Sequence, residues 1–259
     1  MAKALVSIVM PSYNQAAYLE KAIQSVLAQS YPSIEIIVID AASTDGSKKI
    51  IERYSNEFAY WQSKKDRGQT DAINQGFERA TGKYLAWLNA DDQLLPEAVE
   101  QAVEYLEQHP ETGLVYGQAD YINASDKVIG EFPAAQTDYA RLMKAYVHIP
   151  QQAAFWRADL WRELGPLDPE MFFAMDYDLW VRLAKVSEIK YLKRKWGQFR
   201  LHGDSKTMSN DYRAWEDMLR VHAREGGAWF SVMRLKYWLR LLARPFLGWR
   251  RRNVMRQVE

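Results

Sequence analysis

The sequence predicts an α/β protein with a mostly parallel, Rossmann-like central sheet flanked by helices and a helical C-terminal extension. Short β-branched and apolar runs alternate, through the first half of the chain, with segments whose apolar residues recur at helical spacing. Three of these runs end abruptly in polar clusters. Strands that alternate with helices in this way predict parallel strands joined by crossover helices.

The first predicted strand covers residues 4–10 and stops at Pro-Ser-Tyr-Asn, a sequence that breaks strands. Residues 18–29 place apolar side chains at helical spacing, and residues 34–39 are a continuous apolar run, as in a strand buried on both faces. The remaining expected elements are a helix at 47–56, a strand at 58–62, a helix at 70–80, a strand at 84–88, a helix at 96–108 and a strand at 113–116.

Length and composition exclude several classes of protein. A chain of 259 residues is long enough for one large α/β domain or two small ones. Because it has no cysteine, disulfides, thiol nucleophiles and cysteine-based zinc sites are excluded, which suits a reducing cytosol. The N-terminus does not resemble a signal peptide, and no run approaches the roughly 18 apolar residues of a membrane span. We therefore expect a cytoplasmic protein.

The net charge of +1 hides an uneven distribution. Residues 230–259 contain eight Lys or Arg residues and one acid, so residues 1–229 are acidic. We expect a main domain over 1–229 and a basic amphipathic extension over 230–259. An acidic main domain argues against a nucleic-acid-binding protein, whose basic surface normally lies on the folded domain.

The strand at 84–88 ends on Asn89-Ala90-Asp91-Asp92. Adjacent carboxylates raise one another's pKa unless a cation neutralises them. Mg²⁺ or Mn²⁺ is such a cation, commonly held by one or two carboxylates together with substrate phosphates. The cluster therefore predicts a metal–diphosphate site, the alternative being that the two aspartates cap the helix that Pro96 opens. Residues 11–14, Asp40 and residues 89–92 should converge on one crevice, because ligands bind beyond the carboxyl ends of parallel strands.

Four sequence blocks carry a resemblance to a known family. They are VSIVMPSYNQAAYLEKAIQSVLAQSYPSIEIIVIDAASTDGS, RGQTDAINQGFERATGKYLAWLNADD, FFAMDYDLWVRLA and FRLHGDSKT. In this order and spacing, over roughly residues 5–207, they resemble inverting family 2 glycosyltransferases with the GT-A fold. The resemblance implies a single GT-A domain and transfer of a sugar from a nucleotide-diphosphate donor.

The resemblance also implies roles for individual residues. Residues 11–14 would form the loop that holds the base and ribose, and Asp40 would accept hydrogen bonds from either; the alternative for Asp40 is a turn residue. Asp66 resembles a nucleotide-contacting residue, and its alternative is a solvated turn acid. The implied donor-binding set is Pro11, Ser12, Tyr13, Asn14, Asp40, Asp66, Gln69, Asn89, Ala90 and Arg200.

Two departures from the family pattern bear on the donor site. Asn89 stands where the metal motif often begins with Asp, so the metal is expected at Asp91, with Asp92 as a second ligand or an orienting group. His202 is a further candidate ligand, with a solvated loop histidine as the alternative. Many relatives carry Arg at the position of Ile73, which leaves the donor preference open.

Asp176 and Asp178 lie at the start of a predicted helix, where the helix dipole stabilises carboxylates. An ionised carboxylate close to a sugar hydroxyl can take its proton. The resemblance implies that Asp176 is the general base, although Met175 precedes it where the family often has Glu. We expect one of the two aspartates to cap the helix and the other, Asp176, to catalyse.

The extension WFSVMRLKYWLRLLARPFLGWRRRNVMRQVE predicts a helix with a broad apolar arc and Lys236, Arg240 and Arg244 on the opposite side. Aromatic residues beside arginines suit a helix that lies on an anionic cytoplasmic leaflet. The alternative is a terminal helix packed on the domain. Residues 250–252, three arginines, would add attraction to a membrane or form an unstructured end.

Together these features predict an inverting, Mn²⁺- or Mg²⁺-dependent glycosyltransferase that uses a nucleotide sugar, with UDP-sugars favoured. Its acceptor would be a saccharide or lipid-linked hydroxyl in polysaccharide or glycolipid assembly, at the inner face of the cell membrane. One alternative is a sugar-nucleotide nucleotidyltransferase, which normally has a Gly- and Lys/Arg-rich loop where this chain has Pro-Ser-Tyr-Asn. Another is a non-catalytic sugar- or lipid-binding protein. A Rossmann dehydrogenase is disfavoured because no G-x-G-x-x-G follows the first strand.

Overall fold

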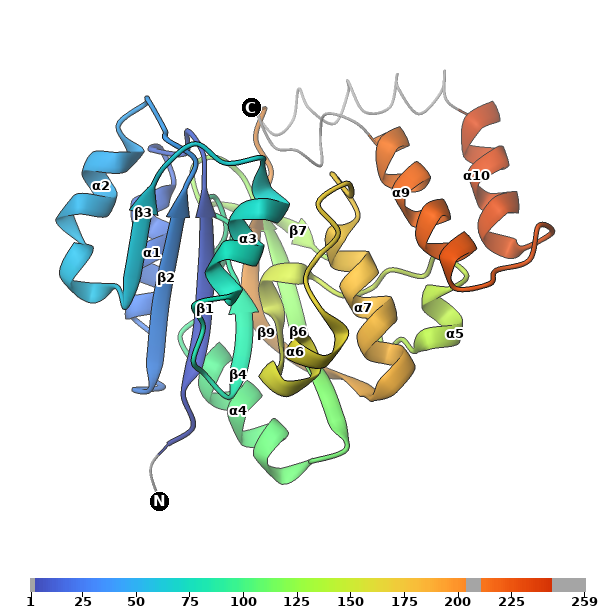
Figure 1. Cartoon of the computed structure of the whole chain (residues 1–259), viewed down its shortest axis with the longest axis horizontal. Coiled ribbons are helices and arrows are strands. Elements are labelled where there is room, and N and C mark those ends of the chain that lie inside the picture. Colours follow the sequence, from blue (N-terminus) through green and yellow to red (C-terminus); the bar gives the residue numbers. More distant parts are fainter. Residues whose placement is uncertain (1–2, 204–210, 244–259) are drawn as a thin grey trace.

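The computed structural model describes residues 3–203 and 211–243, which form one curled sheet with helices on both faces (Figure 1). The strands are β1 (Val6–Ser12), β2 (Ile34–Asp40), β3 (Tyr60–Ser63), β4 (Tyr84–Trp87), β5 (Gln93–Leu94), β6 (Thr112–Ile122), β7 (Val128–Glu131), β8 (Ala154–Arg157) and β9 (Glu188–Arg200). In the described residues the sheet order is β3-β2-β1-β4-β8-β6-β9-β5, and β7 pairs with β6.

The helices follow the order that the sequence predicts for the first half of the chain. They are α1 (Leu19–Leu27), α2 (Ser47–Arg53), α3 (Gln69–Phe77), α4 (Ala98–Gln108), α5 (Tyr139–Leu142), α6 (Ala158–Leu164), α7 (Met175–Val186), α9 (Asp211–Arg224) and α10 (Val232–Leu242), with 3-10 turns at Ser55–Glu57 and Gln151–Ala153. Several boundaries differ: β6, expected at 113–116, continues to Ile122, and β1 continues through Pro11 to Ser12. Beyond Val9 only β2 is paired with β1, so a proline without an N–H is tolerated there.

The sheet is mostly parallel, as predicted. β1 pairs in parallel with β2 and β4, β2 with β3, and β6 with β9, and these pairings contain most of the paired residues. The short strand β8 lies between β4 and β6 and is antiparallel to both, an element that the sequence did not predict. The carboxyl ends of β1, β2 and β4 therefore meet at one edge of the sheet.

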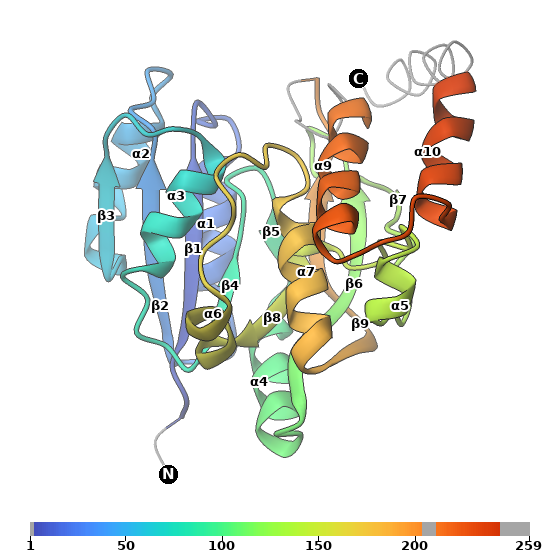
Figure 2. The same cartoon turned by 45° about the vertical axis from the view of Figure 1, so that its right-hand side comes forward.

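The two faces of the sheet bury separate apolar clusters. Val6, Ile8 and Met10 of β1 belong to the cluster that α1, α2 and α4 cover, whereas Val9 belongs to the cluster under α3, α6 and α7. A strand whose alternate residues enter two cores must be apolar throughout, which explains the continuous apolar runs in the sequence. Figure 2 shows α6 and α7 in front of the sheet, with α1 behind it.

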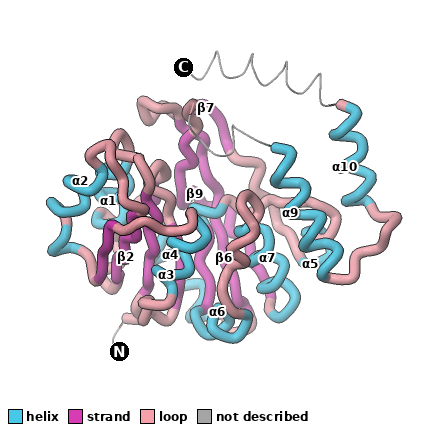
Figure 3. Tube along the Cα trace, turned by 45° about the horizontal axis from the view of Figure 1, so that its top comes forward, coloured by secondary structure: helices cyan, strands magenta, loops and turns pink. Residues whose placement is uncertain are grey.

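The C-terminal helices α9 and α10 lie side by side at the edge of the molecule, far from β1–β3 (Figures 1 and 3). Met233 of α10 is fully buried and joins the same cluster as Met218 and Val221 of α9. The division at residue 229 stays a prediction, while Arg244, Arg250–Arg252 and residues 204–207 of the fourth block lie outside the described residues. Among the helices in 3–203 and 211–243, none is long and apolar enough to cross a membrane.

Candidate active site

The predicted site segments lie beside one another at the carboxyl ends of the parallel strands. Ser12 at the end of β1 is in register with Asp40 at the end of β2. The backbone N–H of Asn14 donates to Ser43 Oγ (2.8 Å), and Thr44 N–H donates to Asn14 Oδ1 (2.9 Å), so the loops after these strands are joined. The segment 89–92 follows β4, the other neighbour of β1. The expected crevice is therefore supported by the strand order.

The loop after β1 combines one exposed ring with one buried hydroxyl. Tyr13 is 62% exposed, and Asn14 has a positive φ of 50°, which turns the chain toward α1. Ser12 Oγ is buried and has no hydrogen-bond partner among the described residues. A buried hydroxyl without a partner is a place where a ligand group can bind.

Asp40 is fully buried at the end of β2. Its carboxylate accepts hydrogen bonds from Ser43 N (3.0 Å) and from Ser63 Oγ (2.6 Å) at the end of β3. These bonds fit the alternative of a turn residue, because they fold the loop after β2 back on itself. Contact between Asp40 and a nucleotide stays a prediction.

One carboxylate oxygen of Asp66 lacks a hydrogen-bond donor among the described residues. Its Oδ1 accepts from Gly68 N (2.8 Å), whereas its Oδ2 is buried and has no partner among the described residues. Burial raises the pKa of Asp66, and the charges of Asp71 and Asp40 raise it further. Arg67 does not neutralise it, since its guanidinium pairs with Asp71 at 2.9 Å. This geometry supports ligand contact at Asp66 rather than a solvated turn acid.

Asn89 joins three elements around the site. Its Oδ1 accepts from Gln69 Nε2 of α3 (2.8 Å), and its Nδ2 donates to Asp92 Oδ2 and to Gln151 Oε1, both at 3.2 Å. Gln151 in turn donates to the carbonyl of Trp87 (2.7 Å). The neutral amide therefore organises the turn instead of offering its oxygen to a metal. The sequence analysis did not assign Gln151 to the site, because its role depends on contacts 62 residues away in the chain.

The side chain of His202 lies next to that of Asp91 in the acidic turn, residues 89–92. Asp91 Oδ2 lies 3.1 Å from His202 Nε2, and the Asp91 side chain is 18% exposed. Two ligand atoms at this separation can share a hydrogen bond or bind one cation. His202 is buried, with its ring 4.7 Å from the ring of Tyr18, so it is not the solvated loop histidine of the alternative.

Asp92 points inward. It is 1% exposed, and its Oδ1 accepts from the backbone N–H of Arg200 (2.9 Å). Burial and the charge of neighbouring Asp91 raise its pKa well above the usual range. Neither aspartate caps the following helix, because α4 starts at Ala98 and its N-cap residue is Glu97. Asp92 therefore orients the turn, whereas Asp91 faces the solvent.

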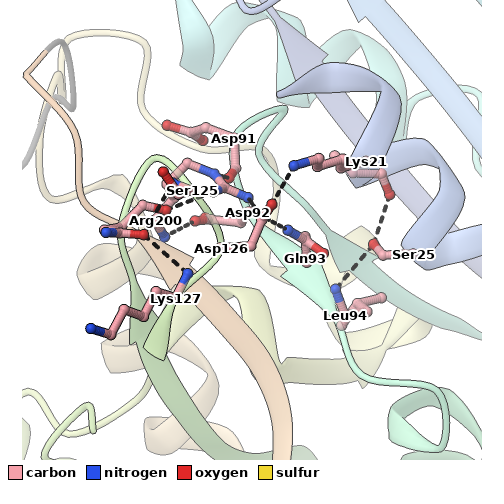
Figure 4. Close-up of polar contacts among 12 residues, drawn as sticks. Lys21, Ser25, Asp91, Asp92, Gln93, Leu94, Ser125, Asp126, Lys127 and Arg200 are labelled. Carbon is pink, nitrogen blue, oxygen red and sulfur yellow. Dashed lines mark hydrogen bonds and ion pairs between the residues drawn. The ribbon is translucent and has the colours of Figure 1, made fainter. Parts of the chain in front are cut away.

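Arg200 holds the backbone of this turn in place through hydrogen bonds (Figure 4). Its guanidinium is fully buried and donates to the carbonyls of Asp91 and Asn123, both at 2.8 Å, and to Asp126 Oδ1 at 2.6 Å. Lys21 of α1 also donates to Asp126. A fully buried guanidinium bound in this way positions the backbone of Asp91, so contact with a diphosphate would require these bonds to break. Asp126, in the turn between β6 and β7, is a site residue that the sequence analysis missed.

Asp176 lies at the start of α7 and is half-buried, with its Oδ1 accepting from Tyr177 N (2.7 Å). Thr70 Oγ1 of α3 donates to the carbonyl of Met171 (3.0 Å). Because Thr70 follows Gln69, which contacts Asn89, this bond brings the start of α7 beside the acidic turn.

The expectation that Asp176 or Asp178 caps α7 is wrong. Asp178 is buried in ion pairs with Arg182 (3.0 Å) and Arg224 (2.6 Å). The N-cap residue is Ala174, and the carboxylate of Asp217 in α9 accepts from Phe173 N (2.9 Å) just before the helix. A carboxylate 44 residues away thus holds the backbone that leads into the helix.

The residues present fit a divalent cation that arrives with a diphosphate. Within the described part of the chain, no group of three His, Cys, Asp or Glu side chains could hold a metal ion. Asp91 and His202 supply two candidate ligands, and Mg²⁺-type sites often take the remaining ones from phosphate and water. Among residues 3–203 and 211–243, the site therefore offers two candidate ligands rather than a complete set.

Comparison with known families decides the membership of the chain. Residues 7–162 match the family model described as glycosyl transferase family 2, which covers more than half of the sequence. The chain belongs to glycosyl transferase family 2. The matched region includes residues 11–14, Asp40, Asp66 and Asp91, whereas Asp176, Arg200 and His202 lie beyond it.

Curated relatives carry the same assignment. An uncharacterized glycosyltransferase of Nostoc sp. is 29% identical over 223 residues, which cover 79% of this chain and 67% of the relative. One of Mycobacterium tuberculosis is 31% identical over 186 residues, or 71% of this chain and 70% of the relative. Both names state the class of enzyme without a substrate, so membership in the family supports a sugar-transfer role.

Solved structures share the fold. S. aureus TarS superposes with a TM-score of 0.70 at 16% identity, over 90% of this chain but 42% of that protein. The mannosyltransferase PcManGT from Pyrobaculum calidifontis, in complex with GDP-Man and Mn²⁺, has a TM-score of 0.68 at 18% identity, over 93% of this chain and 71% of that one. A fragment of TarS bound to UDP-GlcNAc has a TM-score of 0.68 at 16% identity, over 89% of this chain and 69% of the fragment.

Proposed function

We propose that this protein transfers a sugar from a nucleotide-diphosphate donor to a hydroxyl acceptor, with inversion at the anomeric carbon. The observation that carries the proposal is the Asp91–His202 pair at the carboxyl end of β4, beside the loops that follow β1 and β2. The similar structures named above were solved with UDP-GlcNAc and with GDP-Man and Mn²⁺. A nucleotide sugar is therefore the ligand class that best suits this edge of the sheet.

The donor would lie over residues 11–14, with its base near Asp40 and Asp66. Asp66 Oδ2 and Ser12 Oγ are the buried polar atoms that a nucleotide could satisfy. Ile73, where many relatives carry Arg, is fully buried in the core and offers no charge to the donor. We favour a UDP-sugar from the sequence resemblance, and GDP-sugars are the competing class.

Asp91 and His202 would hold Mn²⁺ or Mg²⁺ against the diphosphate, while Asp92, Asn89 and Arg200 keep their turn in place. When bound, such a cation neutralises charge that develops on the departing nucleoside diphosphate. The buried bonds of the turn mean that Asp91 needs little reorganisation as that charge appears.

Asp176 would take the proton of the acceptor hydroxyl as its oxygen attacks the anomeric carbon from the face opposite the leaving diphosphate. Its position supports this role, because it is half-buried at the start of α7, and the bond from Thr70 to Met171 ties the segment before that helix to α3. Asp178 does not compete for the role, since both of its oxygens are held by arginines.

We also propose that the enzyme works in the cytoplasm at the inner face of the membrane, on a saccharide or lipid-linked acceptor in polysaccharide or glycolipid assembly. The eight basic residues of positions 230–259 support attachment to an anionic surface.

A direct test is sugar transfer from UDP- and GDP-sugars with Mn²⁺, with chelator, and with neither. We expect turnover to require the metal and Asp91→Ala to remove most of it, whereas Glu97→Ala, an exposed acid six residues away, should behave as wild type. Full activity of Asp91→Ala in excess chelator would refute the metal assignment. Release of pyrophosphate, in place of a nucleoside diphosphate, would identify a nucleotidyltransferase. Nucleotide-sugar binding without turnover would favour a non-catalytic binding protein.

A further inference from the structure

Helix α10 and the two residues at 229–230 before it carry exposed large apolar side chains, which we call the α10 face. It consists of Trp229, Phe230, Leu235, Trp238, Leu239 and Leu242. Phe230 is 92% exposed and Leu242 is 79% exposed. Scattered apolar residues are ordinary on a protein surface, but a contiguous group of this kind marks an interaction site.

The sequence spacing shows that this face is the apolar stripe of the helix. Leu235, Trp238, Leu239 and Leu242 follow the i, i+3, i+4, i+7 pattern that a helix normally turns toward its own core. Here these residues are exposed by 56% to 79%, whereas Met233 is the one that is fully buried. Helix α10 therefore turns its main apolar stripe away from the protein core.

Two cationic side chains hold α10 against the rest of the protein. Lys236 Nζ lies 3.4 Å from the centroid of the Tyr146 ring and donates to the carbonyl of Lys144 (2.9 Å). The guanidinium of Arg240 lies 5.4 Å from the ring of Trp215 in α9. Cations over aromatic rings are attracted to the negative face of the ring. Lys236 and Arg240, on the side opposite the apolar arc, thus contact the body of the protein.

We propose that the α10 face inserts into the headgroup region of an anionic membrane. This deepens the membrane attachment proposed above and names the surface responsible, but it does not depend on the transferase site. Trp, Phe and Leu are the side chains that interfacial helices bury at the acyl boundary, and Trp favours the interface itself.

The occupant follows from the sequence that continues beyond α10. Residues 244–259 contain five arginines, and Glu259 is the one acid. A second copy of the chain on this face would bring two such segments together, and like charges repel. An anionic lipid surface attracts them, at about 1 kcal/mol for each basic residue close to it. The charge next to the apolar stripe therefore selects an anionic membrane over self-association.

The test is sedimentation of the full-length protein with phosphatidylcholine vesicles that contain increasing phosphatidylglycerol. We expect binding to rise with phosphatidylglycerol and to persist in part at about 1 M salt, where charges are screened within about 3 Å, because the α10 face contributes apolar contacts. Leu239→Glu should lower the partition coefficient by about tenfold or more. Leu27→Glu, at an exposed position on α1, should bind as wild type.

Two outcomes would overturn the proposal. One is equal vesicle binding by Leu239→Glu and wild type. The other is a wild-type dimer in analytical ultracentrifugation that Leu239→Glu converts to monomer without any change in vesicle binding. Stabilisation of both variants by UDP and Mn²⁺, measured as a thermal shift, reports on the donor site separately. Failure of vesicle binding is thereby distinguished from failure of the transferase proposal.

Discussion

Replacing Asp178 by Asn separates the structural aspartate of α7 from Asp176, the proposed general base. The substitution keeps the shape of the side chain but removes the charge from two ion pairs, with Arg182 at 3.0 Å and Arg224 at 2.6 Å. The side chain of Arg182 is 13% exposed, so the pair with Arg182 is buried, whereas Arg224 is 41% exposed and its pair is partly screened by water.

Breaking a buried ion pair on one side costs about 3–5 kcal/mol, because a buried charge is left without compensation. In Asp178→Asn, Arg182 keeps its bonds to the carbonyls of Leu164 (3.0 Å) and Gly165 (2.9 Å). We therefore expect the loss in free energy of unfolding to lie at the lower end of this range, about 3 kcal/mol. For a protein of this size each kcal/mol shifts the Tm by about 2–4 °C. The expected fall in Tm is therefore about 6–12 °C.

Asp176→Asn is the matched variant two residues away. An amide oxygen can still accept from Tyr177 N, so the free energy of unfolding should change by about 0.5 kcal/mol or less. Loss of proton acceptance should lower turnover by about 10² or more, with UDP binding nearly unchanged. The assays are thermal denaturation, sugar transfer and nucleotide titration. An Asp178→Asn protein with wild-type Tm and no turnover, beside an active Asp176→Asn protein, would refute this division of roles.

Three further predictions concern the donor site and α10. Asp126→Asn should raise the Mn²⁺ concentration for half-maximal thermal stabilisation in the presence of UDP by about tenfold, because Arg200 loses its anchor. Asp120→Asn removes the charge from a 2.8 Å pair between Asp120 of β6 and Lys195 of β9 and should leave that concentration unchanged; equal effects of the two variants would contradict positioning by Asp126. Asp66→Asn should weaken UDP binding by about tenfold in calorimetry, and unchanged affinity would place Asp66 outside the donor site. Met233→Ala should lower the free energy of unfolding by about 2–3 kcal/mol, and a change below 1 kcal/mol in denaturant titrations would show that α10 is not docked by this side chain.

The sequence predicts the strands that carry the site well, because these strands depend on local patterns. Apolar runs and helical spacing fix β1, β2 and β4, and the parallel order then requires their ends to meet. Asp91 follows a strand directly, so its place at that edge needs no tertiary information. These are the positions where one-dimensional periodicity and three-dimensional neighbourhood coincide.

The hydrogen-bond and ion-pair partners of the site residues cannot be predicted from local sequence patterns. Asp126 lies in an ordinary polar turn, and nothing in its neighbourhood indicates a bond to Arg200, 74 residues away. Asp217 of another helix holds the backbone just before α7, whereas a search of the local sequence points to Asp176 or Asp178 as caps. A helical wheel separates the charged from the apolar side of α10, but aromatic rings at Tyr146 and Trp215 decide which side faces the protein.

Among the described residues, Asp91 and His202 are the candidate metal ligands, so the proposed site couples metal and nucleotide binding. If the diphosphate supplies further ligands, Mn²⁺ raises the affinity for UDP by some factor, and UDP must raise the affinity for Mn²⁺ by the same factor. Titrating UDP at several fixed Mn²⁺ concentrations measures that factor, and a factor that Asp91→Ala leaves unchanged would show that Asp91 does not carry the coupling. If the factor is large, then at low concentrations the amount of ternary complex follows the product of the two concentrations. Scarcity of either the cation or the donor would then lower activity to the same degree.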